Sequence, residues 1–300
     1  MRKILSLILA VVLVIMPGCT SKNQKAENDK LNIVTTIFPL YDLTKQIAGD
    51  RANVAMLLPT GREAHSYEPT VQDIIKINEC DLFINIGGSA DPWAEAVGKN
   101  GKKNQSQVLS AKNVVDTITE KHHNIYSVDE HVWTSPENAE EIVDAIAEKL
   151  SQIDPANRTF YERNEEIYSE KLDKLDEKFE KLIKGNNKKI VFADRFPFKY
   201  LAEEYHLEYF SAFPGCSSES EPSAATVSNL IDIIKNENIS VVFYTETSNQ
   251  SLPDTICSET GAKKLLMHSC HSVTDEQLKN GISYLELMEN NYQALKEALK

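Results

Sequence analysis

The chain has 300 residues, of which 41% are hydrophobic and 26% charged, with a formal net charge of −13. This is the composition of a globular protein long enough for two domains, and it excludes a mainly disordered, collagen-like or coiled-coil chain. The acidic balance argues against binding to nucleic acid or to anionic lipid through charge, and it suits a cation. Five cysteines in this length exclude a disulfide-framework miniprotein.

The first 18 residues have the pattern of a secretory signal peptide. Two basic residues precede an apolar run at 4–16, which is too short for a permanent membrane span. Cys19 follows Gly18 directly, as in a bacterial lipobox. The pattern predicts cleavage before Cys19, lipidation of its thiol, and an extracytoplasmic lipoprotein anchored to the cell membrane. Residues 19–30 are then a polar, lipid-anchored tether.

From residue 31 onward, short apolar runs alternate with helical patterns. Strands are predicted at Leu31–Ile37, Asn53–Leu58 and Asp81–Gly87. Helices are predicted at Tyr41–Ala48, Val71–Glu79 and Ser135–Ile153, and a polar loop at Thr119–Ser127. The last helix has a serine cap and a proline in its first turn. Strands that alternate with helices predict a mostly parallel sheet covered on both faces, and we assign 31–154 to an N-terminal lobe.

The pattern changes between Pro155 and Lys184, where no strand signal occurs. Apolar residues recur there at helical spacing among Glu, Asp and Lys, at Tyr161, Tyr168, Leu172, Leu175, Phe179 and Leu182. This spacing predicts one amphipathic helix of about 40 Å. Fewer than four heptads, with strands resuming directly afterwards, favour a helix packed on its own chain over a coiled-coil dimer. We therefore predict a rigid linker helix at 155–186.

Alternation resumes after this helix, in a C-terminal lobe at 187–300. Strands are predicted at Lys189–Asp194, Leu207–Phe213, Ile239–Thr245 and Lys263–His268. Helices are predicted at Phe198–Tyr205, Ala224–Asn236 and Leu252–Thr260, with a final helix from Asp275 or later to Leu299. The predicted fold is α/β, with two lobes that are each a mostly parallel sheet flanked by helices.

Four loops that follow predicted strands or precede a helix carry possible metal ligands. They contain His65, His131, Cys216, and the group His268, Cys270 and His271. In α/β sheets, ligands bind at the carboxyl ends of strands, and imidazoles and thiolates suit transition metals. Each residue taken singly also fits an ordinary loop or capping role. Two such loops from each lobe favour a metal site between the lobes.

The segments 61–69 and 129–136 are the most specific motifs, with supporting matches at 33–39 and 198–202. Over nearly its whole length the chain resembles the metal-specific solute-binding lipoproteins of bacterial ABC transporters, the zinc and manganese ZnuA/AdcA-like class of cluster A-I. The resemblance implies that His65 and His131 are metal ligands. Members often carry a histidine-rich loop before the second motif, where this chain has only His122 and His123.

The second lobe departs from the pattern of that family. Zinc-binding members have a histidine where this chain has Arg195, which cannot bind a metal. Manganese-type members use a glutamate from the following strand-end loop, where this chain offers Cys216 and Glu219. The last ligand of the family corresponds to His271, with His268 as the alternative.

Two further alternatives concern the same lobe. A disulfide between Cys216 and Cys270 would remove the thiolate ligand and leave Glu219 in its place. An ion pair between Arg195 and the adjacent Asp194 would brace the cleft without touching the metal.

The resemblance implies a binding protein that captures a divalent metal between its lobes and delivers it to an ABC permease. Imidazole ligands favour Zn²⁺ as cargo, with Mn²⁺ as the alternative. We expect a monomer that is not an enzyme and binds no nucleic acid. A secreted zinc hydrolase is the competing class, but the chain has neither an H-E-x-x-H nor a G-x-S-x-G motif. An added adhesin role is a third possibility.

Overall fold

The computed structural model describes residues 30–88, 91–100, 107–122, 125–185, 189–213 and 221–300. Within this part, Leu31–Lys300 form one compact unit. The predicted signal peptide, tether and lipidation site at Cys19 lie outside the described residues, as do Cys216, Glu219 and His123. Among the described helices, none is both long and apolar enough to cross a membrane.

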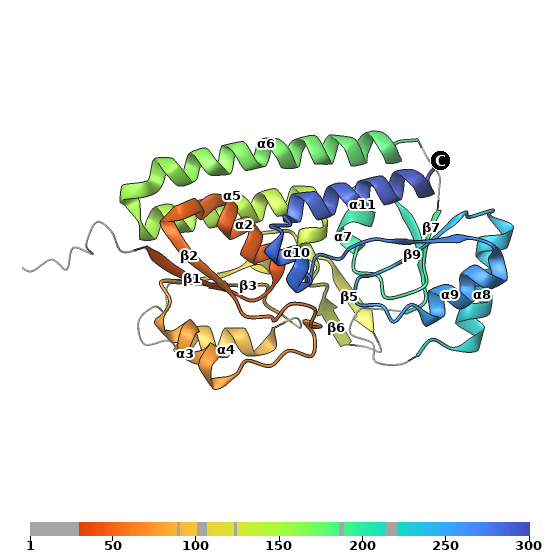
Figure 1. Cartoon of the computed structure of the whole chain (residues 1–300), viewed down its shortest axis with the longest axis horizontal. Coiled ribbons are helices and arrows are strands. Elements are labelled where there is room, and N and C mark those ends of the chain that lie inside the picture. The colour runs from red at the N-terminus through yellow and green to blue at the C-terminus, as the bar shows by residue number, and fades with distance from the viewer. Residues whose placement is uncertain (1–29, 89–90, 101–106, 123–124, 186–188, 214–220) are drawn as a thin grey trace, which may run out of the picture. The chain divides into compact units, whose positions relative to one another are not determined.

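The first sheet contains four parallel strands in the order β2-β1-β3-β4. They are β1 (Leu31–Thr35), β2 (Ala52–Met56), β3 (Leu82–Asn85) and β4 (Val108–Ser110). Alternate residues face opposite sides. Ile33 and Ile84 pack with α2 (Phe38–Ala48) and α5 (Pro136–Ile153), whereas Val34 and Phe83 pack toward α3 (Val71–Glu79) and α4 (Pro92–Asn100). Both faces are therefore covered by helices, as Figure 1 shows.

The second sheet repeats this arrangement in the order β10-β9-β7-β8, again all parallel. Its strands are β7 (Lys189–Phe192), β8 (Glu208–Ser211), β9 (Val241–Tyr244) and β10 (Lys263–Leu266). Its helices are α7 (Lys199–Glu204), α8 (Ala224–Asn236), α9 (Ser251–Thr260), α10 (Asp275–Lys279) and α11 (Tyr284–Ala298). Val191 and Val242 pack against α8 and α9, while Phe192 and Phe243 face the large core that includes α11. The predicted two-lobed α/β class is confirmed.

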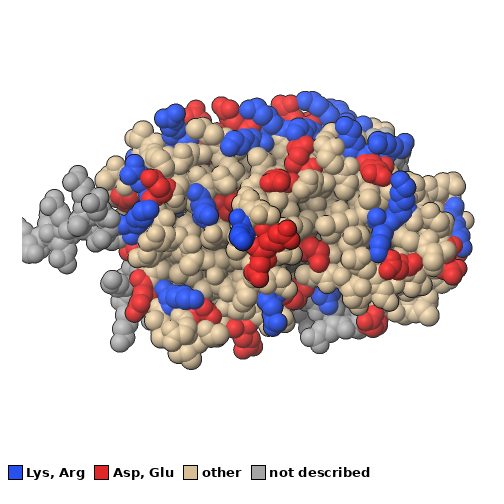
Figure 2. Space-filling model, in the orientation of Figure 1, with Lys and Arg blue, Asp and Glu red and all other residues tan. Residues whose placement is uncertain are grey.

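The predicted linker is the helix α6 (Arg158–Ile183), which follows a 3₁₀ turn at Pro155–Asn157. Its buried stripe is the predicted one, except that Ile183 is buried and Leu182 only partly so. The helix packs on α2 and α5 at one end and on α11 at the other, so it runs alongside both lobes (Figure 1). Its outer face carries mixed Lys and Glu side chains, visible along the upper edge in Figure 2.

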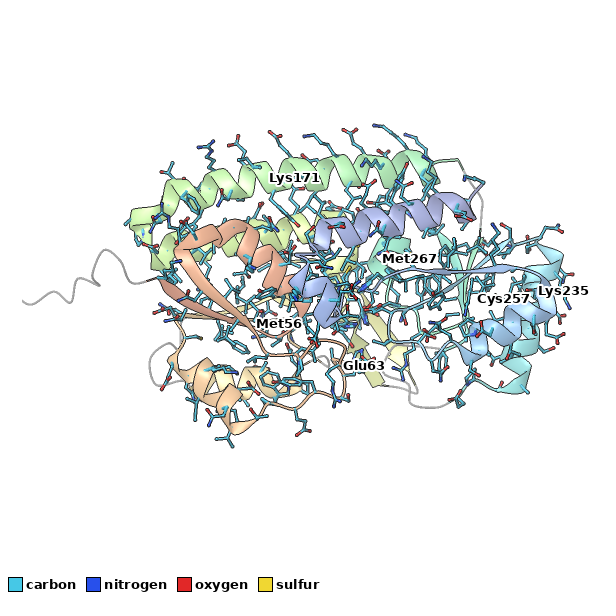
Figure 3. The ribbon with its side chains drawn as sticks, viewed as in Figure 1. Met56, Glu63, Lys171, Lys235, Cys257 and Met267 are labelled. Carbon is cyan, nitrogen blue, oxygen red and sulfur yellow. The ribbon has the colours of Figure 1, made fainter. Side chains whose placement is uncertain are left out.

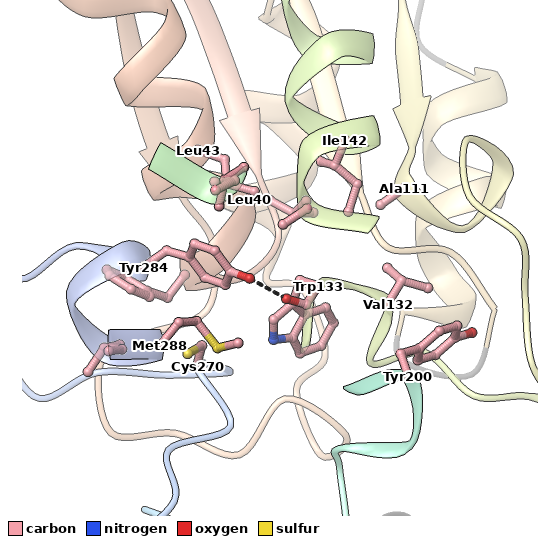
Figure 4. Close-up of a cluster of buried hydrophobic side chains, with 14 of the residues drawn as sticks. Leu40, Leu43, Ala111, Val132, Trp133, Ile142, Tyr200, Cys270, Tyr284 and Met288 are labelled. Atoms are coloured by element: carbon pink, nitrogen blue, oxygen red, sulfur yellow. Dashed lines mark hydrogen bonds between the residues drawn. The ribbon is translucent and has the colours of Figure 1, made fainter. Parts of the chain in front are cut away.

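The C-terminal helix ties the second lobe back to the first. The backbone N–H of Tyr284, at the start of α11, donates to Asp42 of α2 at 2.8 Å. The Tyr284 hydroxyl donates to the backbone oxygen of Trp133 at 2.5 Å, the dashed line in Figure 4. Tyr284 and Trp133 are both fully buried. One hydrophobic core therefore joins residues from Leu31 to Leu299.

Several helix boundaries agree with the sequence prediction. Helices α3 and α8 have the predicted bounds. Helix α5 begins directly after Ser135, whose side chain accepts a hydrogen bond from the Asn138 N–H. Serine at this position satisfies one of the unpaired N–H groups of the first turn, so the capping signal was sufficient to locate the helix start.

Other predictions were wrong. The expected polar loop at Thr119–Ser127 is an antiparallel hairpin of β5 (Thr119–His122) and β6 (Ile125–Val128). Helix α11 agrees with the final helix predicted from Asp275 or later to Leu299, but the short helix α10 before it was not predicted. The two are separated where Gly281 has φ +76 and Ser283 caps α11 by accepting from the Glu286 N–H. Strand β4 and helix α4 were not predicted, since β4 has only three residues and its pairing with β3 is a tertiary effect.

Candidate functional site

Three histidine side chains from distant parts of the chain meet between the two sheets. His65 lies in the loop between β2 and α3, His131 precedes the 3₁₀ turn η4 (Val132–Thr134), and His271 follows β10. One ring nitrogen from each lies within 4.8 Å of the others. The ring centroids are 5.9 Å apart for His65 and His131, 5.4 Å for His65 and His271, and 4.8 Å for His131 and His271.

The carboxyl ends of the two sheets explain why these loops meet. Met56 ends β2 and Met267 follows β10, and Figure 3 labels both near the middle of the molecule. The loops are also bonded to each other. The N–H of Gly61 donates to the oxygen of Val273 at 2.9 Å, and the N–H of Phe38 donates to the oxygen of His271 at 3.4 Å.

The loop that carries His65 is held at both ends. Gly61 adopts φ +67, a conformation that glycine reaches without strain, where it bonds the Val273 oxygen. At the other end, Thr70 and Asp73 form a reciprocal capping box at the start of α3. The Tyr67 hydroxyl donates to the same Asp73 carboxylate at 3.0 Å. His65 is therefore positioned by the backbone on either side of it.

Asp129 holds His131 in place. One carboxylate oxygen of Asp129 lies 2.8 Å from His131 Nδ1 and accepts from its backbone N–H at 2.9 Å. Lys199 lies 3.6 Å from the other oxygen, and the Tyr200 hydroxyl donates to the Asp129 backbone oxygen at 2.6 Å. Burial raises the pKa of Asp129, but the contacts with His131 and Lys199 outweigh burial and the net pKa is lowered. The carboxylate is therefore ionised beside the imidazole.

The indole of Trp133 contacts the loop that carries His271 and holds it in place. The Trp133 Nε1–H donates to the backbone oxygen of Ser269 at 2.8 Å, and the Trp133 ring lies 4.8 Å from the His271 ring. Ser269 Oγ is 3.4 Å from His271 Nδ1. Ser269 itself is bound by the carboxylate of Glu246, which follows β9.

All three rings thus have a polar contact at Nδ1. For His65 the contact is Glu130 Oε1 at 3.2 Å. The Nε2 atoms of His65 and His271 are buried and make no hydrogen bond within the described residues. An unsatisfied buried polar atom costs about 1–3 kcal/mol, so these two nitrogens indicate a place where a ligand binds.

Burial also controls the charge of the cluster. It lowers the pKa of His65 below the ordinary 6.5, and Glu130 opposes this only in part. Burial and the neighbouring His131 and His65 lower the pKa of His271 much further. Both rings are therefore neutral near pH 7, and a neutral imidazole is the form that binds a metal.

A cavity of about 20 Å³ adjoins His65 and His271. Arg195 and Glu63 line it, and their side chains form an ion pair with a nitrogen–oxygen distance of 3.7 Å. The alternative of a side-chain ion pair between Arg195 and Asp194 was wrong, because the Asp194 carboxylate accepts from Thr245 and from the backbone N–H of Arg195. The cavity is the size of one water molecule.

His268 is not part of the cluster. Its Nδ1 accepts from the Cys270 N–H at 3.0 Å, and its backbone is bonded on both sides by the Asn291 amide. Cys270 carries a free, fully buried thiol, which contradicts the disulfide with Cys216. The other predicted second-lobe residues, Cys216 and Glu219, lie outside the described residues.

Sequence patterns did not identify the residues that hold the imidazoles, namely Asp129, Glu130, Ser269 and Glu246. Asp129 and Glu130 directly precede His131 in the chain. Glu246 follows a buried strand, as the predicted ligands do. The rule that placed the ligands at strand ends would have found Glu246 had it been applied to carboxylates.

Comparisons with known proteins find relatives that are described as binding zinc or transporting metal. The zinc-binding lipoprotein AdcA of Streptococcus pneumoniae is 33% identical over 310 residues, which cover 99% of this chain and 61% of AdcA. The Zn(II)-bound ZnuA-like domain of AdcA has a TM-score of 0.77 at 33% identity, covering 90% of this chain and 99% of that domain. The laminin-binding protein Lmb of Streptococcus agalactiae, described as bifunctional with adhesin and metal transporting activity, has a TM-score of 0.78 at 26% identity, covering 90% of this chain and all of Lmb (100%).

A further relative is matched over nearly the whole of its own length. The high-affinity zinc uptake system protein ZnuA of Bacillus subtilis is 31% identical over 307 residues, which cover 97% of this chain and 96% of that protein. The family model of ZnuA, the periplasmic component A of the zinc-uptake complex, matches residues 33–298. Since this match includes both sheets and all three histidines, the chain belongs to the ZnuA family.

Proposed function

We propose that the chain is the zinc-capturing component of an ABC importer, which binds Zn²⁺ between its lobes and delivers it to a membrane permease. The convergence of His65, His131 and His271 carries this proposal. Their nitrogens lie within 4.8 Å of one another. A tetrahedral zinc with bonds of about 2.0–2.1 Å holds its nitrogens about 3.4 Å apart, so a small inward movement of the rings completes the site.

The fourth zinc position is proposed to belong to Cys216. Three imidazoles leave one tetrahedral position open, and the cavity beside His65 and His271 has room for one small group. In the sequence, Cys216 comes five residues after Ser211, the last residue of β8. A thiolate there would reinforce the preference for zinc, because manganese favours oxygen ligands.

The test of the function is a competition titration with zinc and manganese on metal-free protein. We expect zinc to bind tighter than manganese by at least about two orders of magnitude, since imidazole and thiolate ligands follow the general order of divalent affinities. Metal analysis of protein purified without added metal gives an independent reading. Equal affinities for the two ions would contradict the assignment of zinc as cargo.

The pH dependence of zinc binding follows from the charge of the imidazoles. A protonated imidazole cannot bind zinc, and burial lowers the pKa of His65 and His271 below 6.5. In His131→Ala protein, whose remaining imidazole ligands are His65 and His271, the residual zinc affinity should therefore hold steady as pH falls from 7.5 through 6.5 and decline only at lower pH. Isothermal titration at stepped pH measures this. A loss centred on the ordinary histidine pKa of 6.5 in this variant would show that the two rings are not buried as described.

The cellular setting is proposed from the sequence and the relatives together. We infer an extracytoplasmic, monomeric lipoprotein anchored through Cys19, with lobes at 31–154 and 187–300 and a linker at 155–186. The two separate sheets and the helix α6 support this division. The adhesin activity described for Lmb supports the added adhesin role that the sequence left open.

A further inference from the structure

Glu246 binds Ser269 through both of its carboxylate oxygens. Its Oε1 accepts from the Ser269 hydroxyl at 2.5 Å, and its Oε2 accepts from the Ser269 backbone N–H at 2.8 Å. The Glu246 side chain is 12% exposed, and Ser269 is buried. The carboxylate comes from the end of β9 and the serine from the loop after β10, so the contact joins two neighbouring strand ends.

This contact determines what the serine can offer to His271. A hydroxyl has one proton, and here that proton is directed at the carboxylate. Toward His271 Nδ1, 3.4 Å away, Ser269 Oγ therefore presents a lone pair. A neutral His271 must then carry its proton on Nδ1, which leaves the lone pair of Nε2 directed at the other two imidazoles.

We propose that Glu246 is a positioning residue for zinc capture, which acts through Ser269 to set the tautomer and orientation of His271. The inference rests on the proposed zinc-binding function and deepens it. His65 and His131 contact their carboxylates, Glu130 and Asp129, directly. His271, the imidazole from the second lobe, is connected to the Glu246 carboxylate through the Ser269 hydroxyl. This Glu246–Ser269–His271 relay gives it the same support.

His268 is the other neighbour of Glu246, with its Nδ1 3.6 Å from Oε1. That nitrogen already accepts a hydrogen bond from the Cys270 N–H, so its lone pair and not a proton faces that donor. It therefore donates no hydrogen bond to Glu246. The hydrogen bonds of Glu246 within this loop go to Ser269, and its influence passes to His271.

The test measures zinc affinity by chelator competition in Glu246→Gln, Ser269→Ala and the double variant. A glutamine has only one acceptor oxygen for the two Ser269 donors, so the serine proton turns toward His271 and the wrong tautomer is favoured. Loss of such an outer partner costs about 10–100-fold in metal affinity. We expect each single variant to show that loss. The double variant should lose no more than either single, because the residues act in series.

Repeating the substitution in a variant that lacks His271 separates the relay from a general structural effect. In His271→Ala protein, Glu246→Gln should cause no further loss of zinc affinity, because its target is gone. Asp129→Asn is the matched control, since it acts through His131 and its cost should persist in the same background. Thermal unfolding of the metal-free variants reports any damage to the fold.

The outcomes distinguish two kinds of failure. If wild-type protein binds no zinc, the proposed function is wrong. If wild-type protein binds zinc and Glu246→Gln binds it equally well, only the relay is wrong. A Glu246→Gln loss that persists in the His271→Ala background would also overturn the relay.

Discussion

Replacement of His65 by alanine should weaken zinc binding by about two orders of magnitude and leave the fold intact. Four-ligand zinc sites in peptides bind with about 10–16 kcal/mol, or roughly 3 kcal/mol for each ligand, and each 1.4 kcal/mol is tenfold. His65 lies on a loop whose ends are held by other residues, namely Gly61 and the Thr70–Asp73 cap. Chelator competition measures the affinity, and circular dichroism checks the fold.

His206→Asn is the matched control for this loss. His206 is exposed and lies at the end of α7 with φ +54, a conformation that asparagine tolerates. We expect no change in zinc affinity in this variant. If His65→Ala also binds zinc as tightly as wild type, the three-histidine site is not the zinc site.

Chelator competition also measures how much each second-lobe ligand contributes to zinc affinity. His271→Ala should bind zinc weakly through His65 and His131, which both come from the first lobe. Cys216→Ser tests the proposed thiolate and should also lower the affinity. If Cys216 binds the metal, an alkylating reagent should modify it only after chelation. Wild-type affinity in His271→Ala would mean that another group completes the site.

The second large effect concerns unfolding of the protein. Zinc at about 1,000 times its dissociation constant should stabilise the native state by about 4 kcal/mol, because it binds that state alone. For a chain of this size, 1 kcal/mol corresponds to about 2–4 °C, so the unfolding midpoint should rise by about 10 °C. Differential scanning calorimetry with and without zinc measures the shift.

His131→Ala provides the contrast for this stabilisation. The variant lacks a ligand from the rigid side of the site, where Asp129, Lys199 and Tyr200 hold the loop. The zinc-dependent rise in midpoint should shrink to a few degrees at the same zinc concentration. A full rise in this variant would indicate that zinc stabilises the chain from a different site.

Local patterns were enough to predict most of the architecture. Alternating apolar runs and helical spacing predicted two parallel sheets, and the stripe from Tyr161 to Phe179 predicted the long helix α6. These features depend on period and capping, which are properties of neighbouring residues. The rule that ligands lie at strand ends pointed to His65 and to the loop of His268 and His271, and the family resemblance pointed to His131. The structure brings His65, His131 and His271 together.

Contacts between residues distant in the chain determined the features that local patterns did not predict. The three-residue strand β4 exists because β3 lies beside it, and the β5–β6 hairpin forms from residues that read as a polar loop. Glu246 and Ser269 are 23 residues apart, and their contact depends on the order of β9 and β10 in the sheet. Hydrogen-bond partners at a site are set by which strand ends are neighbours, and a one-dimensional pattern carries that information only weakly.

The choice between His268 and His271 shows the same limit most clearly. The two histidines are three residues apart in one loop, and both follow the same strand. Cys270, between them, adopts φ +65, and the backbone turn there directs its N–H to His268. Asn291 of α11 then fixes His268, while Trp133 of the first lobe packs against His271. Contacts with residues from other parts of the chain thus hold His268 within the fold and place His271 in the metal cluster.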